Sequence, residues 1–247
     1  MIPLKTKEQI EMLEKSGMIL GRVMKELEKI VAPGTLTCEI DNLAESLITK
    51  AGARPAFKGY KGFPASVCTS VNEEIVHGIP GERRLLEGDI VGIDLGVNYR
   101  GYFTDAAITV AVGEISSKVQ KLIEVSRNSL EEAIKEARAG RRLFDISSRI
   151  QNFVEQNGFS VVRQFVGHGI GLALHEEPEI PNFGQPNQGP ILKSGMVLAI
   201  EPMINLGSWE ARIMENGWTA VTQDGLASSH FEHTVLIDDE GPRILTN

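Results

Sequence analysis

The 247-residue sequence predicts a mixed α/β (α+β) fold, a single domain built from two similar halves at about 1–113 and 114–247. Apolar residues recur at helical spacing in each half, and short apolar runs typical of buried strands accompany them. Residues 33–52 also align with 139–158, and 88–94 with 195–201, at nearly the same offset. Such a repeat predicts a pseudo-two-fold relation between the halves, although short apolar strings can also match by chance.

Four helices and two groups of strands are predicted in chain order. The first helix begins at the capping-box pattern Thr6-Lys7-Glu8-Gln9 and ends at Ala32-Pro33-Gly34. A second helix runs from about residue 40 to 50, and residues 55–113 predict strands and loops with hairpin-like turns near 78–81 and 98–101. Helices return over 118–139 and about 145–156. Strands then complete the chain around a loop at 182–190.

The composition is that of an ordinary globular protein. Hydrophobic residues make up 42% of the chain and charged residues 23%, with a net charge of -8. This charge argues against a surface for nucleic acid or an anionic membrane, and no nucleic-acid motif is present. Two cysteines, Cys38 and Cys68, provide no disulfide framework, and the sequence has neither a signal peptide nor a stretch that could span a bilayer. We therefore expect a cytoplasmic protein.

Four carboxylates each lie inside an apolar run that predicts a buried strand. They are Asp94, Asp105, Glu201 and Glu232, and the segment Gly167-His168-Gly169 lies between the two pairs. A buried carboxylate is unfavourable unless it is paired or binds a cation. Few Lys or Arg residues lie in these runs, so a metal centre is the simplest common partner. Each residue taken alone could instead be a satisfied core acid, a strand cap or a turn histidine.

The donor set indicates the kind of metal. Four carboxylates and one imidazole are rich in oxygen, unlike a structural zinc site, and suit catalytic Co, Mn, Fe or Zn. Two divalent ions would balance the four negative charges, whereas a single ion would leave acids that hold protons. Two ions can also share carboxylates and a bridging water whose pKa falls towards about 7.

The sequence also resembles a known family. The run from Phe165 to His175, followed by Ile180-Pro181-Asn182, is similar to the signature of type I methionine aminopeptidases, and Phe183 is one departure from it. The order of the five candidate ligands and the segment Val76-His77-Gly78-Ile79-Pro80 also match. The resemblance spans nearly the whole chain and is to the short bacterial type. It implies the pita-bread fold, in which helices cover a curved antiparallel sheet.

The resemblance also implies roles for individual residues. Asp94 would chelate one metal ion, Asp105 and Glu232 would bridge both, and His168 and Glu201 would complete the second. Glu201 would also shuttle a proton, while His175 would contact the scissile carbonyl and His77 the amide nitrogen side. The implied pocket for a methionine side chain consists of Tyr60, Phe63, Cys68, Trp218 and, more loosely, Leu174. A monovalent cation is expected near Asn72 and Ser228, and Phe57 departs from the small residue expected at its position.

The implied activity is removal of N-terminal methionine from peptides and nascent chains when the second residue is small. The ribosome is a candidate partner, and a monomer is expected. Two other interpretations remain. A proline-directed relative such as aminopeptidase P or prolidase usually carries an extra N-terminal domain, for which a first ligand at Asp94 leaves no room. A non-catalytic binding protein on the same fold typically lacks metal ligands, and this sequence has all five.

Overall fold

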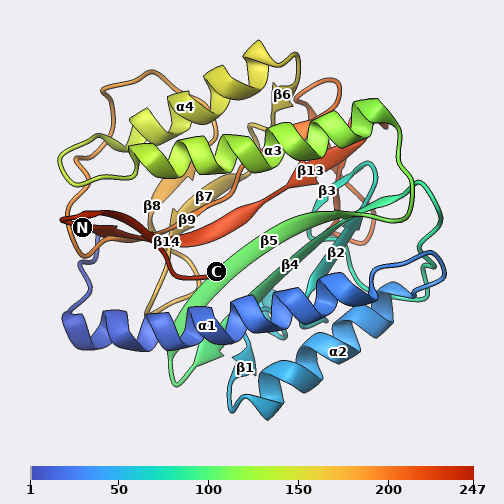
Figure 1. Ribbon diagram of the computed structural model, residues 1–247, viewed down its shortest axis with the longest axis horizontal. Helices are drawn as coiled ribbons and strands as arrows, with labels where there is room; N and C mark the ends of the chain where they lie inside the picture. The colour runs from blue at the N-terminus through green and yellow to red at the C-terminus, as the bar shows by residue number, and fades with distance from the viewer. Residues whose placement is uncertain (1) are drawn as a thin grey trace.

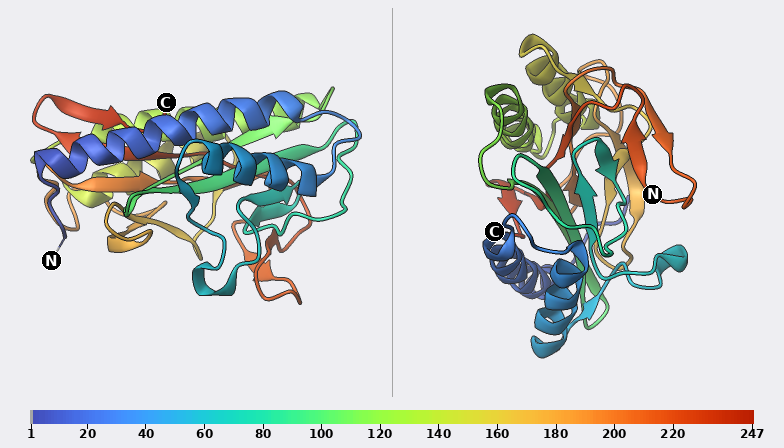
Figure 2. Two further views of the ribbon diagram at one scale, coloured as in Figure 1. Left: turned by 90° about the horizontal axis from the view of Figure 1, so that it is seen from below. Right: turned by 90° about the vertical axis from the view of Figure 1, so that its right-hand side faces the viewer.

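Helices cover one face of a long curved sheet in the computed structural model, which describes residues 2–247 (Figure 1). Within these residues lie four α-helices: α1 (Lys7–Ile30), α2 (Thr37–Lys50), α3 (Ser117–Glu136) and α4 (Leu143–Gln156). Helices α1 and α3 cross in front of the sheet in Figure 1, and Figure 2 shows all four on one side of it. Segments 57–65 and 206–218 project from the opposite side.

The main sheet has nine strands among the described residues, with the order β1-β4-β5-β14-β9-β7-β8, β2 beside β4 and β15 beside β14. Its pairings are antiparallel. The strands are β1 (Arg54–Pro55), β2 (Cys68–Val71), β4 (Ile90–Tyr99), β5 (Tyr102–Ala111), β7 (Val166–Gly169), β8 (Glu176–Pro181), β9 (Val197–Ile200), β14 (Glu232–Asp238) and β15 (Gly241–Ile244). This confirms the predicted fold class, a curved antiparallel sheet covered by helices.

Two small sheets lie beside the main one. The first has the order β13-β10-β6, and the second β11-β12-β3. Their strands are β3 (Glu74–Val76), β6 (Ser160–Val161), β10 (Met203–Asn205), β11 (Ala211–Ile213), β12 (Ala220–Thr222) and β13 (Ser228–His230), and a short 3-10 helix, η1 (Tyr60–Gly62), follows β1. The division of one domain at about residue 113 stays a prediction.

The predicted helix boundaries follow from local chemistry. At the start of α1, the Thr6 backbone N–H donates to Gln9 Oε1 and the Gln9 backbone N–H donates to Thr6 Oγ1, which confirms the capping box. Helix α2 begins at Thr37, three residues earlier than expected, because the Glu39 carboxylate accepts from the backbone N–H of Leu36 at 2.8 Å. The turn at 98–101 joins β4 and β5 as a tight hairpin, with positive φ at Arg100 and Gly101.

The hairpin expected near residues 78–81 is not formed. Strand β3, which precedes this turn, pairs with β12 about 140 residues later in the chain. The turn instead folds back on β2, where Gly78 accepts from the Thr69 N–H and donates to Ser70 Oγ. This arrangement carries His77, at φ 59°, out of the sheet and towards the functional site.

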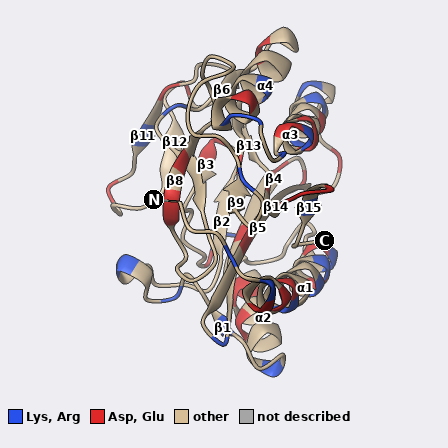
Figure 3. Cartoon of the chain, turned by 90° about the vertical axis from the view of Figure 1, so that its left-hand side faces the viewer, with Lys and Arg blue, Asp and Glu red and all other residues tan. Residues whose placement is uncertain are grey.

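Two apolar layers hold the helices against the sheet. Under α1 and α2, Leu20, Leu27 and Ile40 are fully buried against residues of β4. A second layer packs α3 and α4 on β9 and β14. Each buried side chain of this size contributes about 1.5–3 kcal/mol. Basic and acidic residues are mixed along α1 and α3 (Figure 3). None of the described helices is long and apolar enough to cross a membrane.

Candidate metal centre and substrate pocket

The five candidate ligands come from neighbouring strands of the main sheet. Asp94 on β4 and Asp105 on β5 are close because the two strands form one hairpin, and Ala107 of β5 pairs with both Asp94 and Glu232. Glu201 directly follows β9, and His168 on β7 pairs with Ala199 of β9. Since β14 lies between β5 and β9, residues separated by up to 138 positions converge on one cavity.

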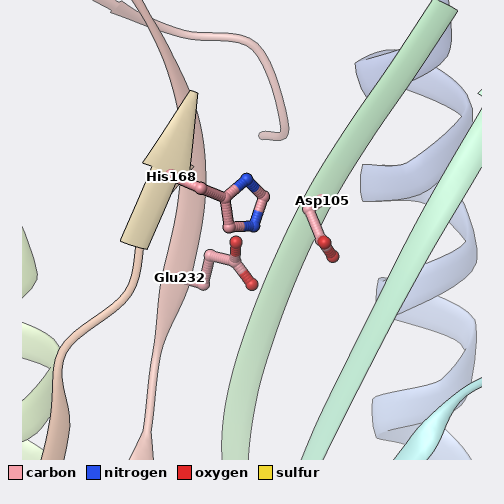
Figure 4. A group of neighbouring side chains, drawn as sticks. All are labelled: Asp105, His168 and Glu232. Carbon is pink, nitrogen blue, oxygen red and sulfur yellow. The ribbon is translucent and has the colours of Figure 1, made fainter. Parts of the chain in front are cut away.

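Three of these side chains lie close together. Asp105, His168 and Glu232 are buried, and one potential ligand atom from each lies within 4.8 Å of the others (Figure 4). The Nδ1 atom of His168 lies 2.9 Å from the carbonyl oxygen of Gly169, an acceptor that requires N–H at Nδ1. The Nε2 lone pair is therefore free for a metal ion. Nε2 also lies 3.6 Å from Glu201 Oε1, which places Glu201 at the same centre.

The acids have no internal cation. Within residues 2–247, no Lys or Arg forms an ion pair with any of the four, and Asp94 Oδ1, Asp105 Oδ1 and Glu232 Oε1 are buried without a hydrogen-bond partner. Orphaned oxygens of this kind are unfavourable in a protein interior. Three such atoms beside an available imidazole nitrogen fit divalent cations with a preference for oxygen and nitrogen donors.

The pKa values of the four acids also favour a bound cation. Burial raises the pKa of Asp105 to about 7. Burial, followed by the charge of neighbouring acids, raises the pKa values of Asp94, Glu201 and Glu232 well above the usual range for carboxyl groups. Without a cation, the cluster therefore holds protons at neutral pH. A bound cation reverses this preference, because its charge favours the ionised carboxylates.

An apolar pocket adjoins the acids in a cavity of about 210 Å³. Phe63 and Trp218 meet edge to face, with ring centroids 5.2 Å apart. The Tyr60 ring stacks on His175 at 5.2 Å and 14°, and His175 in turn lies 4.1 Å from the His168 ring. The pocket wall is thus joined through His175 to His168, one of the candidate ligands.

The two histidines predicted for catalysis, His77 and His175, are neutral at neutral pH. Burial lowers the pKa of His77, and burial together with the charges of His168, Lys61 and His77 lowers the pKa of His175 to about 3. A neutral imidazole can donate one hydrogen bond without carrying charge. This suits a group that stabilises negative charge as it develops on a substrate oxygen.

Comparison with known proteins agrees with this geometry. Residues 11–239 match metallopeptidase family M24. The chain belongs to this family. It is 53% identical to the methionine aminopeptidase of Clostridium perfringens, over 100% of this chain and 99% of that protein, and 51% identical to methionine aminopeptidase 1 of Bacillus subtilis with the same coverage. The predicted resemblance and the assignment to a metal-dependent aminopeptidase are confirmed.

Solved structures of M24 peptidases show the same fold. The methionine aminopeptidase of Thermotoga maritima superposes with a TM-score of 0.99 at 46% identity, covering 100% of both chains. The prolidase of Pyrococcus furiosus gives 0.81 at 27% identity, over 99% of this chain but 65% of the prolidase. Family M24 uses divalent metal ions, in agreement with the donor set of this cavity.

The cavity of this M24 peptidase brings together every residue predicted from sequence for catalysis, metal binding and the pocket. Their individual roles stay predictions. Phe57, the departure from the expected pattern, also lines the wall. Asn72 and Ser228 lie elsewhere but adjoin each other, because the Ser228 backbone N–H donates to the Asn72 carbonyl at 2.9 Å. The monovalent cation expected there likewise stays a prediction.

Sequence reasoning missed one imidazole at the centre. His230 is 3% exposed, and its Nε2 has no hydrogen-bond partner among the described residues and lies 3.7 Å from Glu201 Oε2. Burial lowers the pKa of His230 to about 3, so the ring is neutral. The available signal was its position two residues before Glu232, since residues two apart in an extended segment share a face.

Proposed function

We propose that this M24 peptidase removes N-terminal methionine from peptides and nascent proteins whose second residue is small, with a binuclear centre of divalent ions. One observation carries the proposal: a pocket of Tyr60, Phe63, Cys68, Leu174 and Trp218 adjoins the five candidate ligands in one cavity. Apolar and aromatic walls suit an unbranched thioether. The full-length relatives that are methionine aminopeptidases support the same substrate.

The proposed ligand assignment follows the charges. Asp94 would hold one ion, Asp105 and Glu232 would hold both, and His168 and Glu201 would complete the second, so that two divalent ions would balance four carboxylates. Co, Mn, Fe and Zn all fit this donor set. When bound, the ions polarise the scissile carbonyl and lower the pKa of a water molecule.

The protein's own groups then orient the substrate and move the proton. Neutral His175 donates a hydrogen bond to the carbonyl oxygen as negative charge develops there. Glu201 takes the proton from the attacking water and passes it to the departing amine, while His77 contacts the nitrogen of that bond. His175 packs against both Tyr60 of the pocket and His168. A substrate methionine whose side chain fills the pocket therefore has its carbonyl group placed beside His175.

Specificity for the second residue follows from the same layout. With the methionine side chain in the pocket, the next residue passes the rim beside the metal ligands. Small residues such as Gly, Ala, Ser, Thr, Val, Pro and Cys fit, and larger ones collide with the rim. One methylene in a tight site is worth about 1–3 kcal/mol, so a clash must account for strong rejection. A formyl group blocks cleavage because the free α-amine must reach a metal or an acidic ligand.

Hydrolysis of four peptides tests the function. We expect Met-Ala-Ser to be cleaved, and Met-Ile-Ser, Ala-Pro-Ser and formyl-Met-Ala-Ser to be resistant. Preference for Ala-Pro-Ser would assign the chain to the proline-directed peptidases instead. Equal cleavage of Met-Ala-Ser and Met-Ile-Ser would remove the role of the rim. Metal content measured by mass spectrometry should reach two ions per chain, and activity across Co, Mn, Fe and Zn, measured without air, identifies the effective ion.

We also propose a cytoplasmic monomer that acts on nascent chains and contacts the ribosome. Substrates of this kind emerge during synthesis, and a formylated terminus must be deformylated before cleavage. Co-sedimentation of the metal-loaded protein with ribosomes, beside its mass in solution, tests both parts of this proposal.

A further inference from the structure

A buried ion pair lies immediately behind His175. The side chain of Lys5 is 1% exposed, and its Nζ lies 2.5 Å from Glu176 Oε2, in a carboxylate whose side chain is 9% exposed. A buried pair gains little net stability, because both ions lose their hydration. Its presence here, one residue from a proposed catalytic histidine, therefore calls for an explanation other than stability.

The Glu176 carboxylate closes a short loop. Its second oxygen, Oε1, accepts hydrogen bonds from the backbone N–H groups of Leu172 at 2.6 Å and Ala173 at 3.1 Å. Leu174 and His175 lie between these donors and Glu176, and both line the substrate cavity. The conformation of the segment that carries them is consequently tied to the orientation of one carboxylate.

Lys5 is held firmly where it meets this carboxylate. Its backbone N–H donates to the carbonyl oxygen of Gly195 at 2.7 Å. Its stem crosses Gly171, where a Cβ atom would come within 2.3 Å of Lys5 Cε. Gly171 also adopts a φ of +147° that other residues rarely adopt. The loop is thus shaped to admit the lysine stem from the segment that precedes α1.

We propose that Lys5 is a positioning residue for His175. It acts through Glu176, whose carboxylate it orients so that the loop presents the imidazole between Tyr60 and His168. This role rests on the proposed function, because it concerns the group that contacts the scissile carbonyl. The alternative is that the pair only fastens the N-terminal segment to the sheet.

A mutant cycle separates these roles. Lys5→Met removes the charge but keeps the length of the stem, and Glu176 retains its two backbone donors. We expect kcat for Met-Ala-Ser to fall about 10- to 100-fold, as misplacement of a catalytic group does, with KM and metal content unchanged. Lys5→Arg should recover part of this loss. In a His175→Ala background, Lys5→Met should change kcat by less than about 2-fold, because coupled residues are not additive.

The controls keep the test decisive. Arg149→Met, which breaks an exposed pair with Glu132, should leave kcat unchanged. If Lys5→Met does not fold, the neutral pair Lys5→Met/Glu176→Gln replaces it in both backgrounds. An unchanged kcat, or equal losses with and without His175, would overturn the proposal and leave the pair as a fastener of the fold.

A spectroscopic measurement distinguishes this proposal from the proposed function. Imidazole signals of ¹⁵N-histidine-labelled protein are compared, with those of His175 identified by their loss in His175→Ala. We expect Lys5→Met to shift the His175 signals and to leave those of His233 in place. Unshifted His175 signals would refute the positioning role. Failure of the wild-type chain to cleave Met-Ala-Ser would instead refute the proposed function, and the signals would still test the role of Lys5.

Discussion

Two buried acidic sites in this molecule meet the same electrostatic problem in different ways. Glu176 has an internal cation, Lys5, and two backbone donors, so its carboxylate is fully satisfied within the chain. The cluster of Asp94, Asp105, Glu201 and Glu232 has no such cation among the described residues, and three of its oxygens lack any partner. The two sites are joined through His175, which adjoins Glu176 in sequence and the His168 ring in space.

The difference separates a structural site from a chemical one. A carboxylate whose partners all belong to the chain is held in one orientation and has nothing left to bind. Carboxylates without partners hold protons or bind a cation from solution, and they can exchange one for the other. Glu176 is therefore suited to hold a fixed position, and the cluster is suited to bind cations.

The largest expected effect comes from removing an acid of the cluster. Asp105→Ala should lose metal and nearly all activity, because a carboxylate proposed to hold both ions is gone. Metal analysis and peptide hydrolysis provide the measurements, with the exposed Asp239→Ala as control. Metal content and rate like those of the wild type would show that the cluster does not bind the ions.

Replacement of His175, which joins the two sites, should have a smaller effect. His175→Ala should keep both metal ions but lower kcat by about 10²–10³-fold, as loss of an oxyanion donor does. Loss of metal in this variant would make His175 a ligand, and the set of five would then be incorrect.

Metal should stabilise the folded chain, and this gain should depend on the acidic cluster and not on Glu176. At a metal concentration 100 times Kd, binding adds about 2.7 kcal/mol to the free energy of unfolding. Thermal denaturation should show this gain in the wild type and in Glu176→Gln, and it should disappear in Glu232→Gln. A gain that vanished in Glu176→Gln instead would show that the two sites do not act separately.

The smallest expected effect is the dependence of folding stability on pH in the metal-free chain. Asp105 has a pKa of about 7 when folded, against 3.8 for the free side chain, so its ionisation opposes folding. Its favourable contribution is complete below the unfolded pKa and is lost as pH rises through about 7. The raised pKa values of Asp94, Glu201 and Glu232 act in the same direction.

Urea denaturation of the metal-free chain should therefore show higher stability at about pH 7 than at about pH 8.5. Saturating metal should weaken this dependence, because it keeps the acids ionised. Below about pH 6.5 the histidines act in the opposite direction. All five histidines have lowered pKa values, so they bind protons more readily in the unfolded chain. Stability that rises with pH between 7 and 8.5 would contradict the account of the cluster.

The sequence by itself determined much of this protein. The helices follow from apolar spacing and local caps, and the contacts that stop and start them span only a few residues, as between Thr6 and Gln9. The four acids were recognisable because an ionisable group in an apolar strand is rare and unfavourable without a partner. The resemblance of the segment around His168 then indicated the fold, and the sheet confirmed it.

Only the tertiary structure decided how these parts meet. Nothing in the sequence around Lys5 indicates its partner, which lies 171 residues away. The pairing of β3 with β12 and the approach of His230 to Glu201 likewise depend on contacts between distant segments. Local spacing carries no information on such contacts. Chain folding brings them together, and burial then turns an ordinary lysine into the counter-ion of a carboxylate beside the candidate site.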